Sequence, residues 1–140
     1  MPKSAPSALA FVLSDDEGLA MIAALQQAGV KHNREDIVRI GKKPDGKIVF
    51  LEKGKSGARG SGLAHILEKH QADFAKCGIL QNQIPDVVFA AVIQGQFLSY
   101  QGRREPRREI YQLVFNGRIH YVAVSVADNG YIVGANPASV

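Results

Sequence analysis

The dipeptide Asn116-Gly117 constrains the fold of this chain more than any other feature of its sequence. Asn-Gly between two apolar runs favours the tight turn of a β-hairpin, because both central residues of that turn take a positive φ. The flanking runs, residues 110–115 and 118–126, are rich in the β-branched and aromatic residues that favour strands. The sequence therefore predicts an antiparallel hairpin in the last third of the chain.

Two further strands are predicted around this hairpin. Residues 97–100 contain Phe, Leu and Tyr and predict a strand before it. The Asp-Asn-Gly turn at 128–130 leads into an apolar run at 131–135, which predicts a strand after it. We therefore expect an antiparallel meander over the C-terminal part of the chain.

Helices are predicted over the N-terminal part. Ser14 and Glu17 have the spacing of a capping box, and the apolar pattern that follows predicts a helix to about Ala28. Asn33 is a candidate cap for a second, short helix, which we expect to end at Gly41.

Further along the chain, the apolar run at 48–51 predicts a short strand. Ser61 is a candidate cap for a helix at 63–76, and Pro85 suits the first turn of a helix at 86–93. Helices first and an antiparallel meander last predict an α+β fold, with N-terminal helices packed on a C-terminal antiparallel β-sheet.

The length of 140 residues fits one domain, and the 46% of apolar residues can form its core. We expect residues 1–13 to be a flexible leader and residues 14–140 to be a single domain. The single cysteine, Cys77, excludes an intrachain disulfide and is predicted to be a small buried hydrophobic residue. No apolar run approaches the ~20 residues that span a bilayer.

Basic residues cluster in two predicted loops. The net charge of +4 fits either a solvated surface or an anionic partner such as nucleic acid. A glycine-rich loop holds Lys53, Lys55 and Arg59, and an arginine-rich loop holds Arg103, Arg104, Arg107 and Arg108. Such cations contact phosphate groups, and Tyr100 beside the second loop is a candidate for stacking on a base. The alternatives are solvated loops and a tyrosine that packs against its neighbours.

His65 and His70 lie on one predicted helix and are candidate acid–base groups. Side chains five residues apart point about 140° apart on a helix, which argues against a metal site held by this pair. His70 falls in the apolar stripe, so it is either catalytic or a partly buried helix histidine bonded to the sheet or to a backbone carbonyl. His65 lies in the first turn, where a phosphate can approach the helix N-terminus, or it is a surface histidine. We predict no metal and no cofactor.

These residue types suit the metal-free cleavage of RNA by its own 2′-hydroxyl group. A base removes the hydroxyl proton, an acid protonates the leaving 5′-oxygen, and cations hold the pentacoordinate phosphate. Histidine can act as the acid or the base near neutral pH, and lysine or arginine can supply the cation. Many basic proteins hold the same residue types, so these residues alone do not select this reaction.

The last predicted strand contributes one more candidate, Asn136. Strict alternation places Ile132, Gly134 and Asn136 on one face of the strand. A glycine in mid-strand often marks the close approach of a ligand or of another backbone, so Asn136 is a candidate hydrogen-bonding residue at the edge of a site. The alternative is a turn residue before Pro137.

Three segments together resemble the C-terminal toxin domains of large bacterial surface proteins. They are Asp45-Gly-Lys-Ile-Val-Phe-Leu-Glu-Lys-Gly54, Gly62-Leu-Ala-His-Ile-Leu-Glu-Lys-His70 and Asn129-Gly-Tyr-Ile-Val-Gly-Ala-Asn-Pro137. The family comprises the filamentous-haemagglutinin-like proteins of contact-dependent growth inhibition and related polymorphic toxin systems. The resemblance covers about residues 29–137, and such domains are similar to the barnase/EndoU/colicin/RelE group of ribonucleases.

The resemblance implies a metal-independent endoribonuclease, with tRNA as the expected substrate. It implies two partners, RNA and a cognate immunity protein that blocks the active site. It also implies delivery from a secreted or cell-surface parent protein and action in the cytoplasm of the target cell.

The resemblance implies His65 and His70 as catalytic residues, with Lys53, Asn136 and Glu52 as matched polar positions. Related nucleases often carry a hydroxyl residue on the last strand, at positions where this chain has glycine and asparagine. Ser125 or Tyr131 would then have to supply the hydroxyl group.

Two other classes of function remain open on the sequence. One is a non-catalytic basic module of a phage or surface protein that binds RNA or another protein. It predicts salt-dependent RNA binding without turnover. The other is a different toxin enzyme, such as a transferase, but no glycine-rich phosphate-binding motif follows a predicted strand.

Overall fold

The chain folds as helices and a small hairpin followed by a four-stranded antiparallel sheet. The computed structural model describes residues 16–103 and 107–139. The elements in order are α2 (Asp16–Gln27), η1 (Arg34–Asp36), β1 (Ile37–Lys42), β2 (Ile48–Glu52), α3 (Gly62–Lys76), η2 (Gln81–Gln83), α4 (Ile84–Gln94), β3 (Gln96–Gln101), β4 (Arg108–Phe115), β5 (Arg118–Val126) and β6 (Ile132–Pro137). The predicted α+β class is confirmed. The leader at 1–13, the capping residue Ser14 and Arg104 lie outside the described residues.

The predicted meander is present, with strand order β3-β4-β5-β6. Asn116 and Gly117 form the β4–β5 turn with φ values of 54° and 74°. These two positive values are what a two-residue hairpin of the primed type requires. The turn sets the register, in which Phe115 pairs with Arg118 and every later pair follows without a shift.

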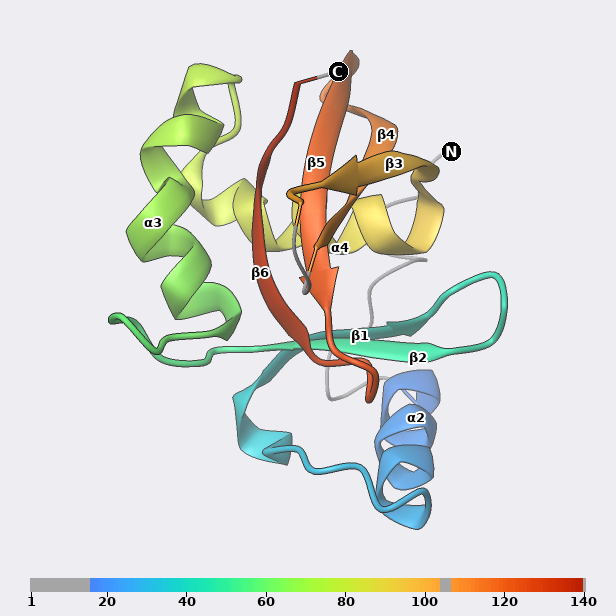
Figure 1. Cartoon of the computed structure of the whole chain (residues 1–140). Helices are drawn as coiled ribbons and strands as arrows, with labels where there is room; N and C mark the ends of the chain where they lie inside the picture. Colours follow the sequence, from blue (N-terminus) through green and yellow to red (C-terminus); the bar gives the residue numbers. More distant parts are fainter. Residues whose placement is uncertain (1–15, 104–106, 140) are drawn as a thin grey trace.

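Helices α4 and α3 enclose the sheet from one face and from one edge (Figure 1). Helix α4 packs on β4 and β5, and its buried residues Val88 and Val92 belong to the same main core as Leu113 and Val124. Helix α3 runs beside β6, with Ile66 and Phe74 fully buried. Cys77 at the end of α3 is half-buried rather than buried. Among the described residues, no helix is long and apolar enough to cross a membrane.

The β1–β2 hairpin crosses the end of the sheet where β5 turns into β6, and α2 packs on the far side of the hairpin (Figure 1). Phe50 of β2 joins the two parts, because its N–H donates to the Gly130 carbonyl and its ring meets Tyr131 edge-on. A second, smaller core lies between α2 and the hairpin and consists of Met21, Ile22, Leu25, Ile37, Ile40 and Phe50.

The predicted helix between Asn33 and Gly41 was wrong. Only one 3₁₀ turn follows Asn33, whose side chain makes no capping bond. Residues Ile37 to Lys42 form β1 instead and pair antiparallel with β2. The β-branched residues of this segment favour a strand once a partner strand is available.

A β-bulge changes which residues of β6 share a face. The register between β5 and β6 shifts between Ser125 and Val126. Ile132 therefore joins the main core, whereas Gly134 and Asn136 lie on the opposite face. The prediction that all three share one face was wrong for Ile132, because strict alternation does not hold across a bulge.

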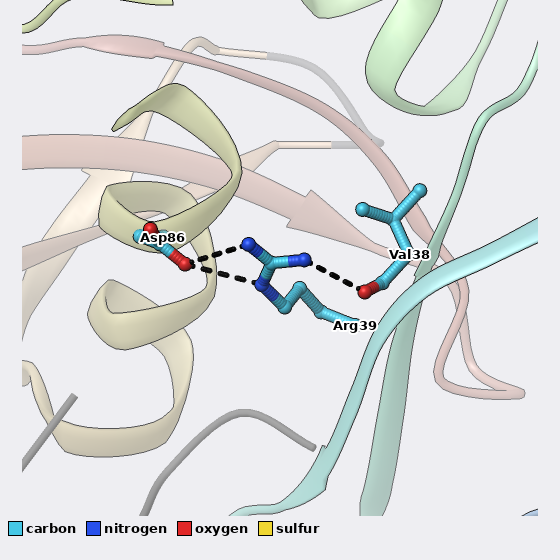
Figure 2. Close-up of polar contacts among 3 residues, drawn as sticks. All are labelled: Val38, Arg39 and Asp86. Carbon is cyan, nitrogen blue, oxygen red and sulfur yellow. Dashed lines mark hydrogen bonds and ion pairs between the residues drawn. The ribbon is translucent and has the colours of Figure 1, made fainter. Parts of the chain in front are cut away.

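One ion pair ties the hairpin to α4. The guanidinium of Arg39 on β1 donates from Nε and Nη2 to the same carboxylate oxygen of Asp86, at 3.1 and 2.9 Å (Figure 2). Nη1 of Arg39 donates to the Val38 carbonyl at 2.9 Å. Asp86 lies in the first turn of α4, where a negative charge also favours the helix dipole.

Replacing Arg39 with methionine is expected to lower the free energy of unfolding by about 1 kcal/mol, because the pair is only partly shielded from water. Methionine keeps the apolar stem and removes the charge. Arg34→Met is the matched control, because Arg34 is exposed in η1. Urea unfolding measures both variants, and an equal loss in the two would contradict a specific role for the pair.

Candidate active site

The sheet face opposite α4 holds a cluster of polar side chains. Leu113 belongs to the core, so Arg108, five residues before it on β4, points to the opposite face. Gly134 lies under the Arg108 guanidinium, and Ser125 is beside it. We call Arg108, Ser125, Gly134 and Asn136 the sheet-face cluster.

Arg108 reaches from β4 across β5 to β6. Its Nη1 donates to Oδ1 of Asn136 at 2.5 Å, and the Asn136 amide nitrogen donates to the Pro137 carbonyl at 2.7 Å. A Cβ atom on Gly134 would stand 2.7 Å from Nη2 of Arg108. The glycine therefore makes room for the guanidinium, which explains why a residue without a side chain stands in mid-strand.

The position of Arg108 corrects one expectation from the sequence. It does not belong to the arginine-rich loop, because it begins β4 and pairs with Gln101 of β3. Burial lowers the pKa of the Arg108 guanidinium below its usual value. The group still carries a positive charge at neutral pH, because arginine does not lose its proton in proteins.

The second group of candidates surrounds the start of α3. Ser61 occupies the N-cap position but makes no capping bond, so the predicted cap was wrong. Its hydroxyl instead lies 2.9 Å from the hydroxyl of Tyr131, which precedes β6. We call residues 53–61, His65 and Tyr131 the loop–helix cluster.

The loop of this cluster is folded tightly against α3. The backbones of Lys55 and Ser61 exchange two hydrogen bonds of 2.9 Å. Gly54 has a φ of +68°, and a Cβ there would stand 1.8 Å from the Ser61 carbonyl oxygen. Only glycine fits this close approach. The glycine-rich loop is therefore closed by backbone pairing at its base.

His65 lies against this loop rather than in open solvent. Its Nδ1 is buried without a hydrogen-bond partner, and a Cβ on Gly60 would stand 2.9 Å from it. A proton on Nδ1 would have no acceptor, so the neutral ring is expected to carry its proton on Nε2. The ring is partly exposed as a whole, which leaves Nε2 as the atom for proton exchange.

His70 is held by a carboxylate. Its Nδ1 lies 3.0 Å from Oδ2 of Asp73, one helical turn along α3, and its side chain is 26% exposed. It is therefore partly buried, as the structural alternative expected, but its partner is a carboxylate and not the sheet or a backbone carbonyl. A histidine oriented by a carboxylate is also a common arrangement for proton transfer.

The cations of the loop point outward. Lys53, Lys55 and Arg59 are exposed. Glu52, a matched polar position, is 4% exposed, and its carboxylate accepts the backbone N–H of Asn33 at 2.8 Å. The exposed cations are free to meet an anionic ligand, whereas Glu52 has a structural contact.

The remaining candidates lie where β3 meets β4. Tyr100 is 49% exposed, and the guanidinium of Arg107 lies 4.3 Å from the centre of its ring. Arg103 is exposed. Tyr111, the other tyrosine near this loop, is buried and donates to Glu109 at 2.5 Å. Burial and that carboxylate raise the pKa of Tyr111 above its usual range, so Tyr111 has a packing role.

The two other histidines have backbone partners. Nδ1 of His32 lies 2.8 Å from the Val30 carbonyl oxygen, and Nε2 of the buried His120 lies 3.1 Å from that of Phe115. These backbone contacts give both histidines a structural role. Within the described ranges, no three His, Cys, Asp or Glu side chains are grouped to hold a metal ion.

Asp73 was not predicted as the partner of His70, although the i, i+3 spacing is visible in the sequence. Nor was the Ser61–Tyr131 contact predicted, which joins residues 70 positions apart. Comparison with models of known protein families and with curated proteins gives no match for this chain. The assignment of function therefore depends on the two clusters and on the resemblance described above.

Proposed function

We propose that this chain is an antibacterial toxin domain that cleaves RNA, with tRNA as the expected substrate, by attack of the 2′-hydroxyl on the adjacent phosphate. One observation supports this most. A guanidinium, that of Arg108, is fixed by Asn136 on the sheet face not covered by α4, over a glycine that leaves space for it. A positioned cation of this kind stabilises the charge that develops on a phosphate in the transition state.

We infer that one RNA strand contacts both clusters, because β6 connects them. Tyr131 precedes β6 and Gly134 follows three residues later, about 10 Å along an extended strand at ~3.3 Å per residue. The phosphodiester chain in the proposed complex runs from the exposed Lys53, Lys55 and Arg59 to Arg108. Tyr100, with Arg103 and Arg107, contacts bases and phosphates further along the strand.

In this proposal the protein supplies proton transfer and positive charge. The 2′-oxygen loses its proton and forms a bond to phosphorus, while the bond from phosphorus to the 5′-oxygen breaks and that oxygen gains a proton. The products are a 2′,3′-cyclic phosphate and a 5′-hydroxyl. His65 exchanges one proton through Nε2, and His70, oriented by Asp73, is the second candidate for this role. Asn136 positions Arg108.

The biological setting belongs to the same proposal and is supported by the resemblance alone. It includes delivery from a secreted or cell-surface parent protein and action in the cytoplasm of a target cell. It also includes an immunity protein that blocks the site. A small acidic reading frame directly downstream of the coding sequence would support this partner.

The proposal is tested by incubating the purified chain with total tRNA in EDTA and following the RNA on denaturing gels. Cleavage is expected. If tRNA stays intact at micromolar protein while circular dichroism shows a folded chain, the proposed ribonuclease activity is excluded. Salt-dependent binding without cleavage would instead favour the non-catalytic RNA-binding module.

Gly134→Ala is expected to reduce cleavage with little loss of stability. The new methyl group would displace the guanidinium of Arg108, which is the end of a flexible side chain and can move. We expect the cleavage rate to fall about tenfold or more, because the cation leaves its position. The same substitution in an Arg108→Gln background should add little. An equal effect in both backgrounds would contradict this role for Gly134.

A further inference from the structure

The two edge strands of the four-stranded sheet differ in how far other elements cover them. Strand β6 is covered by α3 and bridged to β2 through the Phe50–Tyr131 pair. Strand β3 forms the other edge, and β4 is the one strand that pairs with it in the described part of the chain (Figure 1). Every residue from 96 to 100 is exposed. Since no described residue pairs with the outer backbone groups of β3, another strand can bind them.

The side chains of β3 add apolar surface to this open edge. Phe97, Leu98 and Tyr100 are 45%, 36% and 49% exposed. A bulge between Phe97 and Ser99 brings the rings of Phe97 and Tyr100 to one face, with their centres 5.2 Å apart. The bulge gives some protection, but β3 contains neither a charged residue nor a proline, the usual means of keeping an edge strand unpaired.

Opposite charges lie at the two ends of β3: the negative end of the α4 dipole precedes the strand, and a basic residue follows it. The strand begins directly after α4, whose C-terminal end carries partial negative charge and has no basic residue in its last turn. It is followed by Gly102 and the exposed Arg103. In an antiparallel pair of two β3 strands, Arg103 of each copy approaches the end of α4 in the other copy. The two arginines are then kept apart at opposite ends of the pair.

We propose that two copies of this chain associate through antiparallel pairing of their β3 strands about a two-fold axis, which joins two four-stranded sheets into one. Such an interface uses the same surface on both copies. Phe97 and Tyr100 of one copy lie beside the same residues of the other, and aromatic pairs across strands stabilise such a contact. This pairing does not depend on the proposed RNA cleavage, but it encloses Tyr100 and Arg103, so it competes with the RNA contacts proposed for these two residues.

The test is sedimentation equilibrium of the whole chain over a wide range of concentrations. The mass is expected to rise from that of one chain to that of two. Leu98→Lys places a charge from each copy at the paired edge and is expected to raise the dimer dissociation constant about tenfold or more. Because Leu98 is already partly exposed, the variant is expected to fold, and circular dichroism checks this.

Val114→Lys is the matched control. Val114 is 71% exposed on β4, beyond the end of the pairing with β3, so the same change is made away from the edge. We expect this variant to dimerise like the parent chain. In both, the backbone amides of β3 are expected to exchange their hydrogens more slowly at high protein concentration than at low concentration. A parent chain that stays monomeric, or an equal effect of the two lysines, would overturn the proposal.

Discussion

Replacing Arg108 with glutamine is expected to lower the rate of RNA cleavage by about 10²–10³-fold. Glutamine keeps a polar side chain on the sheet face but removes the charge that is proposed to stabilise the transition state. Arg108→Lys should recover only part of the rate, because one ammonium group cannot both bond Asn136 and contact two phosphate oxygens. Single-turnover cleavage of tRNA measures these rates.

Arg34→Gln is the control for Arg108→Gln. It removes the same charge from an exposed position in η1, outside the sheet-face cluster. Its rate should stay close to that of the parent chain. If the cleavage rate falls by the same factor in the two variants, the effect comes from net charge and not from the position of Arg108.

His65→Ala is expected to lower the cleavage rate by about 10²–10⁴-fold, the range for losing a general acid or base. The reason is that Nδ1 is enclosed by the loop while the ring stays partly exposed, so Nε2 can exchange a proton with bound RNA. His32→Ala is the control, because His32 is also partly buried and bonds a backbone carbonyl. Rates are compared at temperatures where circular dichroism finds each variant folded.

His70→Ala decides between the two histidines of α3. If His70 is the acid–base group, its loss should abolish cleavage and that of His65 should not. Asp73→Asn should then also lower the rate, because the carboxylate orients the ring. A His70 variant that melts early but cuts normally when folded would assign His70 to stability.

The parts of the fold that were predicted correctly depend on local chemistry. Asn116-Gly117 fixes a hairpin by its own backbone preferences, and α3 ends where Gly78 takes a φ of +82°. Strand β1 was mispredicted because its structure depends on pairing with β2, which lies beyond a turn. The bulge in β6 depends likewise on the partner strand, so no pattern within 131–135 reveals it.

The candidate site could be predicted in part. The residue types and the two histidines are visible in the sequence, and the helix geometry correctly separates His65 from His70. The reach of Arg108 to Asn136 joins residues 28 positions apart and needs the sheet register. Ser61 and Tyr131 are even further apart in the sequence. A capping role for Ser61 needs only neighbouring residues, so it was the simpler prediction.

The end groups of the cleaved RNA show whether the 2′-hydroxyl is the attacking group. Purified chain is incubated with total tRNA in EDTA, and the fragments are treated with enzymes that act on particular ends. Attack by the 2′-hydroxyl is expected to give fragments with a 2′,3′-cyclic phosphate and a 5′-hydroxyl, formed at a rate that falls in Arg108→Gln. Intact tRNA with a folded chain, or fragments with a 3′-hydroxyl and a 5′-phosphate, would contradict the proposed mechanism.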